Sequence, residues 1–128
     1  QPGKPQGYGS YRGMSVFTLP GNPVSVYVSL HVLVRPALAR MSGAQNALPR
    51  FRPARAAMGW GCPPGRAQFI PVRIAESSGE TIEVEPASAG GSGSHLIGTL
   101  ARAHGIARVE ADIDRVEAGD SVLFWEER

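Results

Sequence analysis

Four short motifs of this 128-residue chain place glycine or a small hydroxyl side chain next to a charged or polar donor. They are PGKP at residues 2–5, PGNPVS at 20–25, PGR at 64–66 and GSH at 93–95. Glycine allows backbone N–H groups to approach an anion, and lysine or arginine adds charge-assisted hydrogen-bond donors. The four motifs together are suited to binding an oxyanion, although each one alone also fits an ordinary exposed turn.

The PGNPVS motif carries the signals of a helix start. The side-chain oxygen of Asn22 can cap a helix, and Pro23 suits the first helical position because its missing N–H would have no partner there. The N-terminus of a helix attracts negative charge, so the first-turn amides and the Ser25 hydroxyl could face an oxyanion. A capping or exposed role for Ser25 stays open as the alternative.

The apolar run after Pro23 has a length that favours a helix over a strand, although its valines would also suit a buried strand. We expect Pro36 to kink or end this helix near Arg35, and Gly43 to stop the helical piece that follows. His31 lies on the apolar face and is expected to be packed there.

The remaining segments predict strands. Residues 14–19 indicate a short strand before the turn, and 44–52 are small and polar, typical of a linker. Alternating or β-branched runs then follow at 54–58, 67–75, 80–86, 106–114 and 120–127. A short helix is expected after the glycine-rich turn, with Leu96, Ile97 and Leu100 inward and Gly105 at its end. The prediction is an α+β chain whose second part is a small barrel or sandwich.

Composition excludes several classes. Thirteen Lys and Arg against eleven Asp and Glu are scattered along the chain, so nucleic acid is not favoured as a partner. No apolar run is long enough to span a bilayer. A single cysteine, Cys62, excludes an internal disulfide and suits a reducing compartment, so we expect a cytoplasmic protein. The first residue is not methionine, and we expect the chain to be cut from a longer protein.

The order of the motifs carries a family resemblance. QPGKPQGYG followed by FTLPGNPVSVYVSLHVLVRPALARMSG closely resembles the C-terminal part of the molybdopterin-binding domain in molybdopterin molybdenumtransferases, a family that includes gephyrin E domains. PGRAQFIPVRI, GSGSHLIGTLARAHGI and EAGDSVLFW resemble that family's C-terminal β-barrel domain. The resemblance implies three parts: the end of the molybdopterin-binding domain at 1–43, a linker at 44–52 and the barrel domain at 53–128.

The resemblance also implies the binding residues. By the family's motifs, molybdate would be bound by Lys4, Pro5, Ser25, Arg66 and Ser94. The loops that hold the phosphate and pterin would include Gly3, Gly21 and Asn22.

Two departures from the family pattern affect this assignment. Gln1 stands where some relatives have a second lysine, which lowers the expected positive charge. Relatives tend to have an arginine at the position of Pro71, and Arg73 could replace it from two residues further on.

The implied reaction is insertion of molybdate into adenylylated molybdopterin with release of AMP, assisted by magnesium. The resemblance implies that the family's acidic catalytic residues lie N-terminal to Gln1. We interpret Asp112, Asp114 and Asp120 as turn and surface residues, so we expect no metal ligands in this chain. We therefore expect the 128 residues to be inactive alone. The family functions as a homodimer, so Lys4 and Arg66 of one chain need not meet.

Two other functions remain open. Gephyrin-like relatives use this region to recognise partner peptides, so a protein-binding scaffold module is one alternative. A domain that only binds molybdate is the other, and three histidines with one cysteine at no ligand spacing do not suggest zinc.

Overall fold

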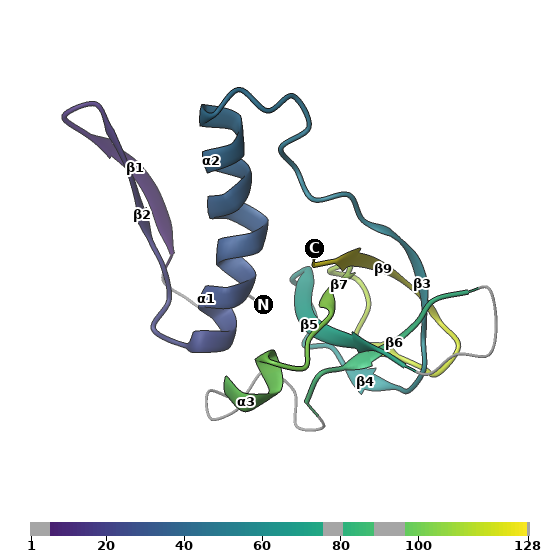
Figure 1. Cartoon of the computed structure of the whole chain (residues 1–128). Coiled ribbons are helices and arrows are strands. Elements are labelled where there is room, and N and C mark those ends of the chain that lie inside the picture. The colour runs from purple at the N-terminus through teal and green to yellow at the C-terminus, as the bar shows by residue number, and fades with distance from the viewer. Residues whose placement is uncertain (1–5, 76–80, 89–96, 128) are drawn as a thin grey trace.

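The computed structural model describes residues 6–75, 81–88 and 97–127. A helical rod separates a two-stranded hairpin from a closed barrel (Figure 1), and a loop of residues 42–51 leads from the rod to the barrel. The α+β fold with a small C-terminal barrel is as the sequence predicted.

The hairpin pairs β1 (Gly7–Tyr11) with β2 (Met14–Thr18). Its two turn residues, Arg12 and Gly13, both have positive φ angles, of 49° and 78°. Such turns match the right-handed twist of the two strands they join. Most side chains of both strands are exposed, and Phe17 is half-buried.

The rod consists of α1 (Pro23–Ser29), a π-helical segment (Leu30–Val34) and α2 (Arg35–Met41). Of the two outcomes expected at Pro36, a kink or an end near Arg35, the end does not occur, because the rod continues past Pro36 as α2 after the π-helical segment. The Arg35 N–H donates to the Leu30 carbonyl, one residue further back than in an α-helix. This widened turn accommodates the proline, which has no N–H of its own to donate.

The rod ends where the sequence predicted, at Gly43. This residue has a φ of 88°, and its N–H donates to the Arg40 carbonyl at 3.0 Å while the Ala44 N–H donates to Ala39 at 2.9 Å. Glycine adopts this left-handed conformation without the steric cost of a Cβ.

Five strands close the barrel in the order β3-β6-β5-β7-β9. They are β3 (Arg52–Ala56), β5 (Gln68–Ile74), β6 (Glu83–Pro86), β7 (Gly105–Val109) and β9 (Ser121–Glu126). Strands β3 and β6 are parallel, and the other neighbours are antiparallel. A small ribbon of β4 (Trp60–Gly61) and β8 (Arg115–Val116) lies beside it.

The helix expected after the glycine-rich turn ends earlier than predicted. α3 spans Ile97–Leu100, and Gly105 begins β7 rather than ending the helix. Gly105 faces β9 so closely that a Cβ there would overlap the Trp125 carbonyl and lie 2.9 Å from the Phe124 ring. Close strand approach, and not helix termination, is the reason for glycine at this position.

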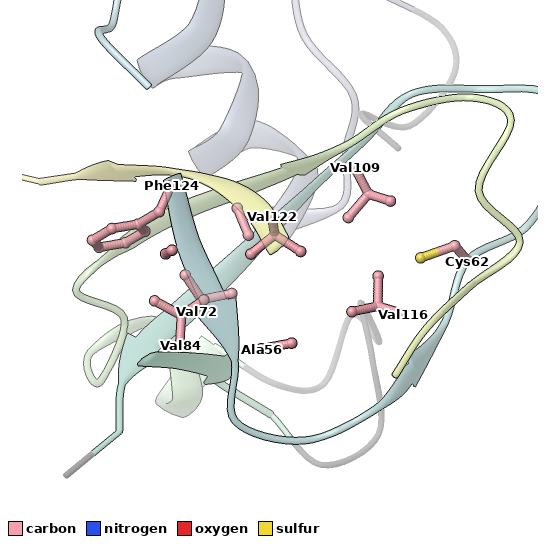
Figure 2. Close-up of a cluster of buried hydrophobic side chains, with 10 residues drawn as sticks. Ala56, Cys62, Val72, Val84, Val109, Val116, Val122 and Phe124 are labelled. Atoms are coloured by element: carbon pink, nitrogen blue, oxygen red, sulfur yellow. The ribbon is translucent and has the colours of Figure 1, made fainter. Parts of the chain in front are cut away.

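The barrel core is small and aliphatic. Val72, Val84, Ala107 and Phe124 are fully buried. Figure 2 shows Val72, Val84 and Phe124 in one group, with Cys62, Val109 and Val116 extending the cluster toward the β4–β8 ribbon. Full burial of a valine or phenylalanine side chain contributes about 1.5–3 kcal/mol to the stability of the fold. A few tightly packed side chains therefore stabilise the barrel.

Candidate functional site

The structure describes only part of the predicted binding set. Gly3, Lys4, Pro5 and Ser94 lie outside the described residues. Ser25, Gly21, Asn22 and Arg66 lie within them.

The PGNPVS turn caps α1 as its residue types predict. The Asn22 Oδ1 atom accepts a hydrogen bond from the Val24 N–H at 2.9 Å, and a weaker contact from the Ser25 N–H at 3.5 Å. Ser25 is 7% exposed, so its hydroxyl sits at a nearly closed helix start. Gly21 is exposed beside it. The cap therefore fixes the backbone around Ser25.

The chain that follows the PGKP motif is fastened to the same face of the rod. The Ser29 hydroxyl donates to the Gln6 side-chain oxygen at 3.0 Å, and Ser29 is fully buried. Ser29 comes four residues after Ser25, so the two serines share one helix face. Sequence reasoning missed this link; the signal was a serine one turn after the motif serine and a glutamine directly after PGKP.

Arg66 lies on a loop that is fixed at both ends. Gly65 has a φ of 85° and its N–H donates to the Ala111 carbonyl at 3.0 Å, while the Gln68 side-chain amide donates to the Pro63 carbonyl at 3.1 Å. Arg66 itself is exposed and has no ion pair within the described ranges. Its guanidinium is available to an anion. No hydrogen bond or ion pair joins it to Ser25 in the described part of the chain.

Arg73 lies at the other end of β5, up to about 23 Å along the strand from Arg66 at 3.3 Å per residue. It forms an ion pair of 2.5 Å with Glu85, which is directly opposite it on β6. Arg73 lies two residues beyond Pro71 on the same face of β5, so its replacement of the family's arginine at that position stays a prediction, with its guanidinium already paired to Glu85.

A polar network around the buried His31 joins the rod to Trp125 of β9 and to Glu127, the residue that follows this strand. The Tyr27 hydroxyl donates to the Glu127 carboxylate, and the His31 Nε2 atom lies 3.2 Å from it. The Arg35 guanidinium lies 3.1 Å from His31 Nδ1. The His31 ring also contacts the rings of Tyr27 and Trp125, with centroids 4.5 and 5.1 Å apart. His31 is packed, as expected, but among polar partners that its sequence neighbours do not reveal.

These contacts set the charge state of the network. Burial lowers the pKa of His31, and Arg35 lowers it further against the opposing effect of Glu127. The neutral ring satisfies both neighbours, since Nε2–H donates to Glu127 and Nδ1 accepts from Arg35. Burial, followed by the hydrogen bond to Glu127, raises the pKa of Tyr27 well above its usual value. The network is therefore a neutral tyrosine and a neutral histidine around one carboxylate.

Two cavities border the rod. One of about 670 Å³ lies between the rod, the 44–52 segment and β9, and its lining includes Arg35, Arg50, Phe51 and Trp125. The other, of about 570 Å³, is an apolar groove between the hairpin and the rod, lined among others by Tyr8, Phe17, Leu33 and Met41. Of the aromatic residues, Phe124 belongs to the core and Trp60 packs against it, whereas Trp125 faces the first cavity.

Within the described residues, no three His, Cys, Asp or Glu side chains come together in a way that could hold a metal ion. Cys62 is buried, and burial raises the pKa of its thiol, so it is not an activated nucleophile. Among the described helices, none has the length and apolar character needed to cross a membrane.

Comparison with known proteins gives consistent matches. Residues 53–126 match the family model for the MoeA C-terminal region (domain IV). Molybdopterin molybdenumtransferase 2 of Mycobacterium tuberculosis (strain ATCC 25618 / H37Rv) is 35% identical over 129 residues, covering 98% of this chain and 30% of that protein. Molybdopterin molybdenumtransferase of Haemophilus influenzae is 32% identical over 136 residues, covering 97% of this chain and 30% of that protein.

A solved structure matches over almost the whole chain. The molybdopterin biosynthesis MoeA protein from Pyrococcus horikoshii OT3 has a TM-score of 0.74 and 27% identity, covering 99% of this chain and 30% of that one. The chain thus spans about 30% of the length of the relatives it matches.

Proposed function

This chain belongs to the MoeA family, and we propose on that basis that it forms the C-terminal part of a molybdopterin molybdenumtransferase. The proposed reaction inserts molybdate into adenylylated molybdopterin and releases AMP. The observation that carries the proposal is the extent of the match, since relatives with that name align with 97–98% of the chain and so with nearly all of the oxyanion-type motifs.

In this proposal Arg66 supplies the barrel's fixed positive charge. Molybdate is a tetrahedral dianion, and a guanidinium can give it two parallel charge-assisted hydrogen bonds. Two features support the role: the Arg66 side chain is exposed without an ion pair in the described ranges, and its loop is tied to Ala111 and through Gln68 to Pro63. A fixed loop orients the charge before the anion arrives.

The rod supplies the second half of the proposed site. We assign molybdate binding also to Lys4, Pro5, Ser25 and Ser94, and the phosphate and pterin loops to Gly3, Gly21 and Asn22. The Asn22 cap and the Gln6–Ser29 hydrogen bond support this assignment, because they hold Ser25 and the chain after PGKP against one helix face.

Magnesium, the acidic catalytic residues and the dimer partner complete the proposal. The described residues offer no group of carboxylates for magnesium, so its ligands are assigned to other parts of the protein and no step here runs through it. We propose a cytoplasmic homodimer in which the site lies between the rod region of one subunit and the barrel of the other.

A protein-binding module is the second candidate. The apolar groove between the hairpin and the rod favours it, since Tyr8, Leu33 and Met41 leave large apolar side chains exposed there. Exposed apolar patches of this kind mark interaction surfaces. A molybdate-binding domain without transferase activity is the third.

The test is AMP release from adenylylated molybdopterin in the presence of magnesium and molybdate. Two proteins are compared: the 128-residue chain, and a chimera in which these residues replace the matching segment of the Mycobacterium tuberculosis relative. The chimera should be active and the chain alone inactive. Arg66→Ala in the chimera should raise the KM for molybdate by about 10–100-fold, which corresponds to one lost charged hydrogen bond of about 1.5–3 kcal/mol.

Arg115→Ala is the matched control, since Arg115 is also an exposed arginine, on the β4–β8 ribbon beside the barrel, but is paired with Glu117. A folded chimera without AMP release contradicts the transferase proposal. An unchanged KM in Arg66→Ala contradicts the place of this arginine in the site. Tight molybdate binding by the isolated chain, in the absence of activity in the chimera, favours the binding domain.

A further inference from the structure

A third cavity, of about 780 Å³, lies on the barrel away from the PGR loop. Its lining comes from the end of β5, from β6 and from the segment between α3 and β7, and consists of Arg73, Ile74, Ala75, Glu85, Ala101, Arg102 and His104. Two guanidinium groups and an imidazole thus line a space that contains one carboxylate. None of these residues belongs to the proposed molybdate site.

Hydrogen bonds hold His104 in one orientation and select one tautomer of its neutral ring. The backbone N–H of His104 donates to the Val72 carbonyl, and the backbone carbonyl of His104 accepts from the Glu127 N–H, both at 2.8 Å. The Ile74 N–H donates to the side-chain Nδ1 atom at 2.9 Å. Because Nδ1 accepts, the neutral ring carries its proton on Nε2, and this N–H is the donor left for another group.

Arg73 is positioned by its strand partner. The ion pair between one of its terminal nitrogens and the Glu85 Oε1 atom fixes the guanidinium across the β5–β6 ladder. A guanidinium has five N–H donors, so the remaining ones stay available. Glu85 is mostly covered, with a side chain 20% exposed, and neutralises only one of the two arginine charges.

Arg102 contributes a charge that no described residue neutralises. It follows α3, is exposed, and forms no ion pair or hydrogen bond within the described residues. With Arg73 matched to Glu85, the described residues that line the cavity carry one net positive charge when His104 is neutral. The apolar side chains of Ile74, Ala75 and Ala101 line the same space.

We propose that this cavity binds the phosphate group of a small organic molecule. Arg102 and the His104 Nε2–H would bind the phosphate oxygens, supported by the free N–H groups of Arg73, because a phosphate takes several charge-assisted donors at once. The volume exceeds that of a free phosphate ion and falls in the range of small-molecule sites, so the apolar lining would contact the body of the ligand.

The site is distinct from the one assigned to molybdate. Arg66 precedes β5, whereas Arg73 and His104 lie where β5 ends and β7 begins. In the β5–β7 register, Gln68 pairs with Val109 and Val72 pairs with Gly105, so the two arginines lie at opposite ends of the same strand pair. The inference therefore stands independently of the proposed transferase function.

The experiment titrates the 128-residue chain with phenyl phosphate and with inorganic phosphate, following amide and imidazole signals by NMR. Phenyl phosphate should give saturable shifts at Ile74 and His104 and should bind more tightly than inorganic phosphate. Arg102→Ala should weaken phenyl phosphate about tenfold or more, and Arg102→Lys should weaken it less because the charge remains.

Arg115→Ala is the matched control and should leave the affinity unchanged, because Arg115 is exposed, paired with Glu117 and outside the cavity. Arg66→Ala tests separately whether the PGR loop takes up the same probe. Arg102 is exposed, so an unchanged melting temperature will show that its variants are folded. Equal affinity in Arg102→Ala, or shifts confined to residues outside the cavity, would overturn the site. Equal affinity for the two phosphates would overturn the assignment to an organic ligand, and a loss in Arg66→Ala equal to that in Arg102→Ala would overturn the separation from the PGR loop.

Discussion

Replacing Tyr27 with phenylalanine tests whether the polar network holds the barrel against the rod. The substitution removes the hydroxyl that donates to Glu127 and keeps the aromatic ring beside His31. Tyr27 and Glu127 are 100 residues apart in the sequence, so their hydrogen bond forms only when the two parts of the chain are assembled. The variant therefore measures the contribution of this junction.

The expected loss follows from the exposure of the acceptor. A hydrogen bond to a charged group contributes about 1.5–3 kcal/mol, and solvent screens the Glu127 side chain, which is 35% exposed. We therefore expect Tyr27→Phe to lower the free energy of unfolding by about 1.5 kcal/mol. For a chain of this size the melting temperature should fall by about 4–8 °C.

A double-mutant cycle separates the hydrogen bond from other effects of the substitution. Tyr27→Phe and Glu127→Ala are measured singly and together by urea unfolding, with tryptophan fluorescence as the signal. The coupling energy should be about 1 kcal/mol. Tyr11→Phe is the matched control, because Tyr11 is exposed in the hairpin and should change stability by less than about 0.5 kcal/mol.

The reasoning would be refuted by a coupling energy near zero. The same conclusion would follow if Tyr27→Phe and Tyr11→Phe had equal stabilities. In either case the Tyr27 hydroxyl would contribute nothing beyond its contact with water, and the contact between barrel and rod would depend on the His31–Glu127 pair and on packing.

Three further predictions concern single residues. Stability should fall as the pH is lowered below the ordinary histidine pKa of 6.5, because burial lowers the pKa of His31 and the unfolded chain then binds a proton that the folded chain does not; His31→Gln should flatten urea unfolding measured from pH 7.5 to 5. Gly105→Ala should destabilise the barrel by about 3 kcal/mol or more through overlap with β9, whereas Gly61→Ala, which meets open space, should stay within about 1 kcal/mol by thermal unfolding. The buried thiol of Cys62 should react with a thiol reagent about a hundredfold more slowly in the folded chain than in urea.

Each of these has a contrary result. An unfolding free energy that stays level down to pH 5 in the unmodified chain would mean that His31 is protonated without cost in the fold. If Gly105→Ala and Gly61→Ala had the same melting temperature, β7 and β9 would be able to move apart at no cost in stability. Labelling of Cys62 at similar rates in folded and unfolded chains would place the thiol at the surface.

The sequence predicted those features that depend on neighbours in the chain. Asn22 caps α1 and Gly43 ends the rod because side-chain oxygens and left-handed backbone act over one turn. The effect of Pro36 was less well predicted, because the widened turn that accommodates this proline depends on a hydrogen bond from the Arg35 N–H to a carbonyl five residues back instead of four. Gly105 was misassigned because its reason is a strand more than fifteen residues away.

The candidate sites divide in the same way. The sequence by itself determined the motifs, their order and the family, because turns and oxyanion-binding motifs consist of residues that are adjacent in the chain. Tertiary structure decided which of these donors keeps a free charge: Arg73 is paired with Glu85, whereas Arg66 and Arg102 are unpaired in the described residues. It also decided that His31 meets Glu127 and that His104 accepts from Ile74. Such contacts arise only when barrel closure brings distant segments together, and no periodicity of a single segment encodes the partner of a side chain.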